Sequence, residues 1–409
     1  MKRYHPLEAV QEPPSPASAA SAEAEPRTDA SLLPKGLRWL PGAFFLLCVA
    51  LGAAAVALTP EALRFPESGS WRRGERTARF ERDLDAALPF REAAITTWGV
   101  LEYTLLGEGR PGVLIGEDDW LFTDEEFAVY PEEAARLAAT LEEVVRVQGA
   151  LAEHGAELAL ALVPAKARVY DDKLGRYRLP AEVSARYDAF RSALVARGVL
   201  APDLLTPLLE ARAEAPVFLR TDTHWTPFGA QVAARALAAA LRPALPEDSE
   251  LFRAAYETRT LPPEPFEGDL LAFVPLGPLQ HLGPPPETLE PRTTEAVGER
   301  EQGGLFDTPE IPVVLVGTSY SAGERWNFAG ALREALGADV LNVADEGLGP
   351  LPPMHAFLDA ATLRDTPPEL VIWEFPERYL PIPNGPEGDA LIDEAAAAGA
   401  VPNPLPETP

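Results

Sequence analysis

Two short segments of this 409-residue chain carry side chains that could form an acyl-transfer site. In the first, Asp222 lies two residues before His224. An aspartate at that spacing can hydrogen-bond the imidazole, fix its tautomer and stabilise its protonated form. In the second, Ser319 follows an apolar run and Gly317, just before a predicted helix. A serine there exposes its hydroxyl, and the helix N-terminus favours a developing oxyanion.

Each segment also has a simpler interpretation. Asp222 could merely form a turn, with His224 on a surface loop. Thr318, Ser319 and Ser321 could merely cap the next helix. The pair is more informative than either part, because together they would supply a nucleophile, a base and an orienting acid. Of the five histidines in the chain, only His224 has a neighbouring acid in a plausible site.

The surrounding sequence alternates between predicted strands and predicted helices. Short apolar runs predict strands at 158–163, 217–220, 313–316, 340–343 and 370–375. Helical spacing predicts helices at 131–155, 180–198, 227–241, 324–336 and 354–363. Thr226 is the expected N-cap of the third of these helices. This alternation favours a doubly wound α/β sheet, with both candidate segments at the carboxyl ends of its strands.

Three further regions are expected to surround this sheet. Residues 111–122 predict a β-hairpin with its turn at 117–119. Residues 71–105 predict one or two amphipathic helices, and the candidate buried positions on them are Leu84, Leu88, Phe90 and Trp98. The proline-rich stretch 247–309 has weak periodicity, and we interpret it as a long surface insertion.

The N-terminal part of the chain predicts a membrane anchor. Residues 39–58 are uncharged and mostly apolar, and a helix of about 20 residues spans the roughly 30 Å hydrocarbon core of a bilayer. A cleaved signal peptide is the alternative, since Ala53, Ala55 and Ala57 are small, but the preceding segment is too long for an ordinary signal. Basic residues flank both ends, so charge does not decide the orientation. Residues 1–36 and 383–409 predict loosely ordered tails.

Composition excludes several classes of function. The net charge is −28, which repels phosphate backbones and makes nucleic acid an improbable partner. Cys48 is the single cysteine, so no internal disulfide can form. No Cys/His cluster offers a structural zinc site, and we predict no cofactor and no metal.

A family resemblance rests on several of these motifs together. The combination of DTHW (222–225), GTSYS (317–321) and IWEFPERYL (372–380) resembles the AlgJ/AlgX family of alginate O-acetyltransferases. These are SGNH-hydrolase-like enzymes in which the Asp-x-His element precedes the serine element, as it does here. Supporting blocks are LPFR (88–91), PGVLIGEDDWLF (111–122), PAKARVY (164–170), WNFAGAL (326–332) and EGLGPLPPM (346–354). The resemblance covers residues 70–380, and the anchor together with the short C-terminus is more similar to the membrane-anchored AlgJ branch.

The resemblance implies a function and a location. It implies a periplasmic domain, held by a single pass in the bacterial inner membrane, that acetylates an exopolysaccharide. The acetyl donor would arrive through a multi-pass membrane O-acyltransferase partner. Ser319 would take the acetyl group, His224 would act as general base and then general acid, and Asp222 would orient His224. The Ser319 backbone N–H would supply one oxyanion donor.

Other residues near these motifs are candidates for contact with a substrate. Aromatic faces stack on sugar rings, and arginine pairs with uronate carboxylates, which makes candidates of Trp225, Tyr320, Arg325, Trp326 and Asn327. The alternative is that Trp225, Trp326 and Phe328 are core residues. Lys166 and Arg168 could meet an anionic substrate or lie on a solvated loop. We expect structural roles for Trp373 and Glu374.

Two other functions remain open from the sequence. An esterase or deacetylase would use the same residues, because water or a sugar hydroxyl can resolve the same acyl-enzyme. A non-catalytic polysaccharide-binding scaffold would bind saccharide without needing Ser319 or His224. The polysaccharide itself is not identified by the sequence.

Overall fold

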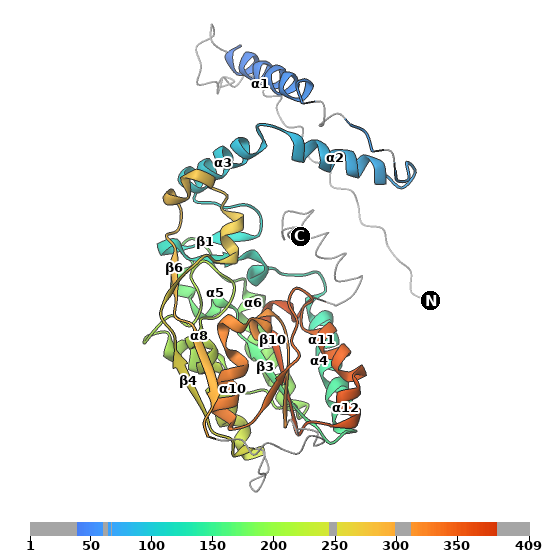
Figure 1. The fold of residues 1–409 in the computed structure, drawn as a ribbon, viewed down its shortest axis with the longest axis vertical. Coiled ribbons are helices and arrows are strands. Elements are labelled where there is room, and N and C mark those ends of the chain that lie inside the picture. Colours follow the sequence, from blue (N-terminus) through green and yellow to red (C-terminus); the bar gives the residue numbers. More distant parts are fainter. Residues whose placement is uncertain (1–38, 60–63, 67, 245–251, 299–311, 383–409) are drawn as a thin grey trace, which may run out of the picture. The chain divides into compact units, whose positions relative to one another are not determined.

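The computed structural model describes residues 39–59, 64–66, 68–244, 252–298 and 312–382 (Figure 1). The predicted tails, 1–36 and 383–409, therefore lie outside the described residues. By its contacts the chain divides into two compact units, Met1–Arg91 and Glu92–Pro409. The second unit carries both candidate segments.

The first unit contains the predicted anchor helix. Helix α1 (Leu40–Ala57) has a mean hydropathy of 2.2, and none of it is buried. By length and composition it is the one helix among the described residues that could cross a bilayer. Pro41 lies in its first turn, where a missing N–H costs little.

The amphipathic region 71–105 forms two helices, as predicted. They are α2 (Glu75–Ala87) and α3 (Arg91–Leu101), and α3 continues into a π-helical turn, Glu102–Leu106. The prediction of buried positions is wrong for two residues, since Phe90 is 40% exposed and Trp98 is 59% exposed. Leu84 and Leu88 are half-buried. The error arises because amphipathic spacing identifies an apolar side chain but not whether another element covers it.

A four-stranded parallel sheet forms the centre of the second unit. Its strand order is β3–β10–β8–β9. The strands are β3 (Glu157–Val163), β10 (Leu370–Pro376), β8 (Val313–Val316) and β9 (Val340–Asn342). These four strands confirm the predicted ones, and β3, β8 and β10 are almost wholly buried. The predicted strand 217–220 is wrong, because Phe218 forms only an isolated bridge with Trp225.

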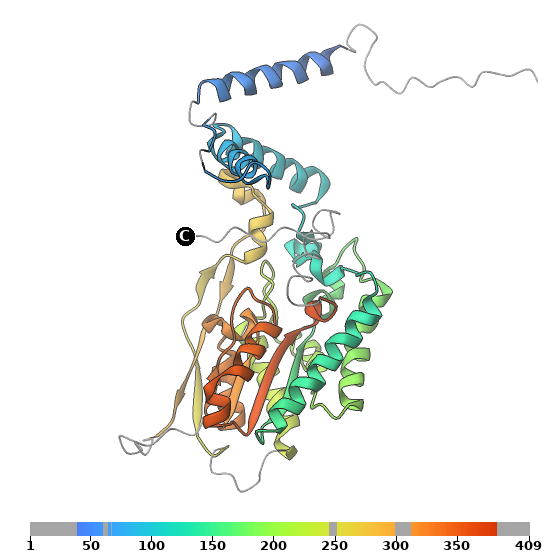
Figure 2. The ribbon, with the colours of Figure 1, turned by 90° about the vertical axis from the view of Figure 1, so that its right-hand side faces the viewer.

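Helices cover both faces of the sheet, which confirms the doubly wound α/β architecture. On one face Leu158, Leu160 and Leu162 of β3 pack in one apolar core with side chains of α4 (Glu133–Ala152), α6 (Ala181–Ala196) and α11 (Leu351–Asp359). Figure 2 shows α4 running alongside the sheet. On the other face the alternate β3 residues pack with α7 (Leu205–Ala211), α8 (Pro227–Leu241) and α10 (Phe328–Leu336). Thr226 caps α8 by accepting the Gly229 N–H, as predicted.

Two predicted helices are interrupted. The segment 324–336 contains a 3-10 turn (Glu324–Trp326) and α10, separated by Asn327 with φ 54°. A left-handed residue cannot continue a right-handed helix, so the chain turns there. The segment 354–363 likewise divides into α11 and α12 (Ala361–Asp365), because Ala360 is extended.

The predicted hairpin is present, and its turn has an unusual backbone. Strands β1 (Val113–Ile115) and β2 (Leu121–Thr123) pair antiparallel. Between them Asp118 and Asp119 have φ values of 54° and 61°. Aspartate tolerates this left-handed region better than most residues, which suits the Glu117–Asp119 sequence to the turn.

The described part of the stretch 247–309, residues 252–298, contains more regular structure than we predicted. Strand β4 (Tyr256–Thr260) pairs with β7 (Arg292–Ala296), and β5 (Glu264–Phe266) pairs with β6 (Glu287–Leu289). The many prolines keep these strands short, which hides their period in the sequence. The segment also positions the candidate site, because Glu287 accepts the backbone N–H groups of Arg220 and Thr221, both at 2.6 Å.

Candidate active site

A buried lysine holds the loop that carries His224 in place through hydrogen bonds to backbone carbonyl oxygens. Lys166 is 1% exposed, and its ammonium donates to the carbonyl oxygens of Leu121 at 2.5 Å, Arg220 at 2.9 Å and Asp222 at 2.9 Å. Burial lowers the pKa of Lys166 to about 8. Both sequence interpretations of Lys166, contact with substrate and a solvated loop, are therefore wrong, because the side chain satisfies three internal acceptors.

Three other candidates for contact with a substrate are also internal, which confirms the alternative that Trp225 is a core residue. Trp225 and Tyr320 are 0% and 1% exposed. The Trp225 indole donates to the Tyr320 carbonyl at 3.1 Å, and the Tyr320 hydroxyl donates to the Thr223 carbonyl at 2.5 Å. Arg168 donates to both carboxylate oxygens of Glu377, at 2.5 and 3.0 Å. Trp225 and Tyr320 thus join the histidine loop to the serine turn instead of meeting a sugar.

Ser319 lies on the turn that follows β8. Thr318 is the N-cap of α9 (Ser319–Ala322), so Ser319 is the first residue of that helix. Its N–H makes no hydrogen bond to another described residue and could therefore donate to an oxyanion. Because α9 has only 4 residues, the local amide rather than a long helix dipole would stabilise such an oxyanion.

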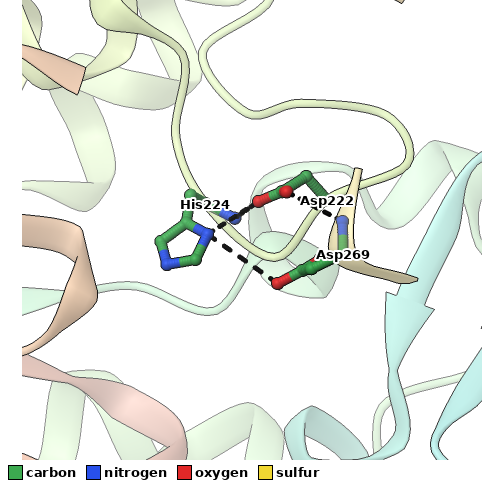
Figure 3. Close-up of side chains that lie close together, drawn as sticks. All are labelled: Asp222, His224 and Asp269. Carbon is green, nitrogen blue, oxygen red and sulfur yellow. Dashed lines mark hydrogen bonds and ion pairs between the residues drawn. The ribbon is translucent and has the colours of Figure 1, made fainter. Parts of the chain in front are cut away.

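The structure brings the three predicted catalytic residues into one chain of hydrogen bonds. His224 Nε2 lies 2.7 Å from Ser319 Oγ, and His224 Nδ1 lies 2.7 Å from Asp222 Oδ1. Asp222 Oδ1 also accepts the His224 backbone N–H at 2.8 Å. Figure 3 shows the Asp222 carboxylate at the Nδ1 side of the imidazole. This arrangement places the basic Nε2 towards the serine hydroxyl, as a nucleophile–base pair requires.

The environment of Asp222 favours its ionised form. Its side chain is buried, and burial opposes ionisation, but the hydrogen bond and charge of His224 outweigh this effect and lower the pKa of Asp222. The carboxylate therefore remains an acceptor for the imidazole Nδ1–H. A fixed Nδ1–H tautomer leaves Nε2 free to take a proton.

Sequence reasoning missed a second carboxylate at the imidazole, that of Asp269. Its backbone N–H donates to Asp222 Oδ2 at 2.9 Å, and its carboxylate accepts from the Thr223 N–H and hydroxyl at 2.8 and 2.6 Å. Asp269 Oδ2 lies 3.8 Å from His224 Nδ1 (Figure 3). Partial removal of this carboxylate from water and the neighbouring charge of Asp222 raise the pKa of Asp269, although its side chain remains 42% exposed.

No local signal could have identified Asp269. It lies 47 residues after Asp222, at the start of a 3-10 turn in the stretch that we interpreted as an insertion. Asp222, His224 and Asp269 place potential ligand atoms within 4.8 Å of one another, which is close enough for a cation. The 2.7 Å Nδ1–Oδ1 distance is that of a hydrogen bond, so the arrangement suits proton sharing better.

A pocket of about 500 Å³ opens over Ser319 and His224, and we call it the catalytic pocket. Its lining includes the side chains of five acids and one arginine, namely Asp222, Glu267, Asp269, Glu324, Glu346 and Arg325. Arg325 and Trp326 are therefore the two predicted substrate contacts that line it. Trp326 stacks on the His224 ring at 5.0 Å between centroids, and its indole donates to the Ser319 carbonyl at 3.1 Å. Asn327 lines a neighbouring pocket instead.

A fully buried carboxylate supports the serine turn from β10. Glu374 accepts the Thr318 N–H at 2.7 Å and hydrogen bonds from the Thr318 and Ser321 hydroxyls at 3.0 and 3.1 Å. A side chain at Gly317 would lie within 2.5 Å of Glu374 Oε2, so glycine is required for this close approach. Trp373 donates to the Pro350 carbonyl. The expected structural roles of both β10 residues agree with these contacts.

Glu374 gives a prediction for stability against pH. Burial raises the pKa of Glu374 from 4.5 to about 7. Between these values the folded chain holds a proton that the unfolded chain has lost, so the free energy of unfolding falls as pH rises. Glu374→Gln should remove this dependence. The expected change in the free energy of unfolding is up to about 3 kcal/mol, because a pKa difference of one corresponds to 1.36 kcal/mol. Urea denaturation of both proteins at pH 4.5 and 7.5 measures it.

The matched control for this prediction is Glu142→Gln, which removes an exposed carboxylate paired with Arg197. That variant should keep the pH dependence of the unaltered protein. Parallel stability curves for Glu374→Gln and the unaltered protein would show that Glu374 is already ionised in the folded state at low pH.

The chain is similar to known proteins over most of its second unit. The family model described as an SGNH hydrolase-like domain, acetyltransferase AlgX, matches residues 113–377. The probable alginate O-acetylase AlgJ of Azotobacter vinelandii is 46% identical over 314 residues, covering 76% of this chain and 80% of that protein. The AlgJ protein of Pseudomonas aeruginosa is 45% identical over 316 residues, covering 74% and 79%.

A solved structure shares the fold. The O-acetyltransferase domain of Pseudomonas putida AlgJ is 44% identical, with a TM-score of 0.62, and the match covers 68% of this chain and 95% of that chain. The family match includes the loop with Asp222 and His224 and the turn with Ser319. The chain therefore belongs to the AlgJ/AlgX family of SGNH hydrolase-like proteins, on the AlgJ side of that family.

Proposed function

We propose that this protein is an O-acetyltransferase that acetylates a bacterial exopolysaccharide of the alginate type through an acetyl-serine intermediate. The observation that carries the proposal is the continuous hydrogen-bonded chain from Asp222 through His224 to Ser319. Relatives named alginate O-acetylase support the reaction and the substrate class.

In the first half-reaction Ser319 takes the acetyl group. Its Oγ attacks the carbonyl carbon of the donor, and His224 Nε2 accepts the hydroxyl proton. Asp222 holds the Nδ1–H and stabilises the resulting imidazolium. The Ser319 N–H donates to the tetrahedral oxyanion. When the intermediate collapses, His224 returns the proton to the leaving group and the acetyl group remains on Ser319.

In the second half-reaction a sugar hydroxyl takes the acetyl group. His224 Nε2 accepts the hydroxyl proton as the sugar oxygen attacks the acetyl carbon, and it then returns a proton to Ser319 Oγ. Trp326 lies over the imidazole and is bonded to the Ser319 carbonyl, so it fixes both catalytic groups and covers one side of the reacting centre.

The proposed location follows from the anchor and the chemistry together. Helix α1 would hold the protein in the bacterial inner membrane by a single pass, with the second unit on the periplasmic side, where the polysaccharide is exported. A multi-pass membrane O-acyltransferase would supply the acetyl donor from the other side. The apolar character of α1 supports the anchor, and the family supports the setting.

The experiment that tests this function follows the fate of the acetyl group. The full-length protein in detergent is given 4-nitrophenyl acetate with and without an alginate oligomer. We expect acetylated oligomer to form at the expense of free acetate, and both products to require Ser319. Acetate release that is unchanged by the oligomer would identify an esterase. Oligomer binding without any Ser319-dependent turnover would identify a non-catalytic scaffold.

A further inference from the structure

A second pocket, of about 360 Å³, adjoins the catalytic pocket. We call it the basic pocket, and the polar residues on which the argument rests are Arg292, Thr294, Asn327, Arg333 and Asn342. Gly323 and Glu324 line both pockets. These two residues follow directly after the turn that carries Ser319, so a ligand in the basic pocket would lie beside the reacting group.

The basic pocket carries two arginines that form no direct ion pair, although the charges of Glu214, Glu290 and Glu334 act on Arg292 from a greater distance. Arg333 of α10 donates to the Val340 carbonyl at 2.8 Å, and Arg292 of β7 donates to the Gln231 side chain. Neither forms a salt bridge within the part of the chain that the structure describes. Each guanidinium group carries five N–H donors, and the hydrogen bonds above use one donor of each, so both groups retain donors for a ligand.

The residues that line this pocket carry a net positive charge, whereas those that line the catalytic pocket carry a net negative charge. Its lining contains one carboxylate, that of Glu324, against the two arginines. The catalytic pocket contains five carboxylates against one arginine, and the whole chain carries a net charge of −28. A ligand carboxylate would be repelled from the catalytic pocket and attracted to the basic pocket. The difference in charge between the two pockets would therefore orient an anionic ligand, with its carboxylate in the basic pocket.

The remaining polar groups suit a ligand rich in hydroxyls. Asn327, with φ 54°, donates to the Thr294 hydroxyl at 2.9 Å, and Asn342 donates to the Ser321 carbonyl at 2.7 Å. These bonds fix the amide side chains in the wall of the pocket. A side chain at Gly330 would overlap Asn327, so glycine keeps this wall open. Fixed amides and hydroxyls are the groups that orient a sugar by hydrogen bonds.

We propose that the basic pocket binds the carboxylate of an anionic sugar unit next to the unit whose hydroxyl reaches Ser319. The inference rests on the proposed function, which it deepens by assigning a carboxylate subsite. Guanidinium groups pair with carboxylates through two parallel N–H donors, so the pair fixes the orientation of the carboxylate as well as attracting it. The acidic catalytic pocket then selects a hydroxyl-bearing part of the acceptor rather than its carboxylate.

The test measures binding without any acetyl donor. Calorimetry of the full-length protein compares an alginate oligomer with the same oligomer after its carboxylates are reduced to alcohols. The unaltered protein should bind the anionic oligomer about tenfold more tightly. In the double variant Arg292→Gln, Arg333→Gln that preference should disappear. Higher salt should weaken binding of the anionic oligomer only.

Two further variants make the result specific. Arg197→Gln removes one arginine from an exposed ion pair with Glu142 and should leave the preference unchanged. The double variant Arg292→Lys, Arg333→Lys keeps both charges and should retain part of the preference, which also serves if the glutamine pair fails to fold. Thermal unfolding of each variant monitors the fold.

The results also separate this inference from the proposed function. Equal affinity of the unaltered protein for the two oligomers, or an undiminished preference in the folded glutamine variant, would overturn the basic pocket as a carboxylate subsite. A preference for the anionic oligomer without any transfer of acetyl groups to it would instead overturn the proposed function and leave the subsite standing.

Discussion

Ser319→Ala is expected to abolish acetyl transfer and to lower kcat by about 10³-fold or more, as for the nucleophile of other serine-dependent sites. The variant retains the imidazole but has no oxygen to carry the acetyl group. Ser319 Oγ bonds only to His224 Nε2 among the described residues, so its loss removes little else. The measurements are turnover of 4-nitrophenyl acetate and acetylation of an alginate oligomer.

The control for this first prediction is the thermal stability of the Ser319→Ala protein. Alanine is a good residue for the first position of α9, so the unfolding temperature should change by only a few degrees. A Ser319→Ala protein that unfolds normally and keeps more than a tenth of the turnover would remove Ser319 from the mechanism.

Asp222→Asn is expected to lower kcat by roughly 10³- to 10⁴-fold, the size seen when a triad aspartate becomes an amide. Asp222 accepts three hydrogen bonds, from the His224 N–H, from His224 Nδ1 and from the Asp269 N–H. An asparagine must turn its NH₂ group towards at least one of these donors. If it faces the imidazole, Nδ1 becomes the acceptor and the proton moves to Nε2. In that tautomer His224 cannot accept the proton of Ser319.

Asp269→Asn is the matched control for the second prediction. It removes a carboxylate 3.8 Å from the imidazole but keeps the Asp269 backbone N–H that bonds to Asp222. We expect a fall in kcat of about tenfold, because the tautomer of His224 is preserved. Both variants are compared by the pH profile of kcat. Equal losses in the two variants would show that the charge near the imidazole matters more than the Asp222 hydrogen bond.

The central sheet was predictable because its strands are locally distinct. Buried parallel strands appear as short apolar runs between glycine, proline and polar residues, and β3, β8 and β10 are runs of this kind. The segment 217–220 has similar residues, but Phe218 instead packs under the histidine loop and bridges to Trp225. A run of three apolar residues, Val217 to Leu219, does not show whether sheet partners are available.

The three catalytic candidates were predictable because each lies in a recognisable motif. The residues that hold these three candidates in place were not predictable from the sequence. Lys166 reaches Asp222 across 56 residues of sequence, and Asp269 reaches it across 47. Neither lies in a pattern that distinguishes it from a surface charge. Tyr320 was a candidate for contact with sugar, and Trp225 was open between sugar and core. An aromatic residue beside a catalytic motif looks the same in sequence whether it faces the pocket or the core.

The most direct test of the catalytic assignment is mass spectrometry of the full-length protein, quenched in acid within its first turnovers of 4-nitrophenyl acetate and then digested. The assignment predicts one acetyl group on the peptide that contains Ser319. This group should be absent from Ser319→Ala and His224→Ala, and it should disappear from the unaltered protein when an alginate oligomer is added. Turnover that proceeds at full rate while this peptide never carries an acetyl group would contradict it.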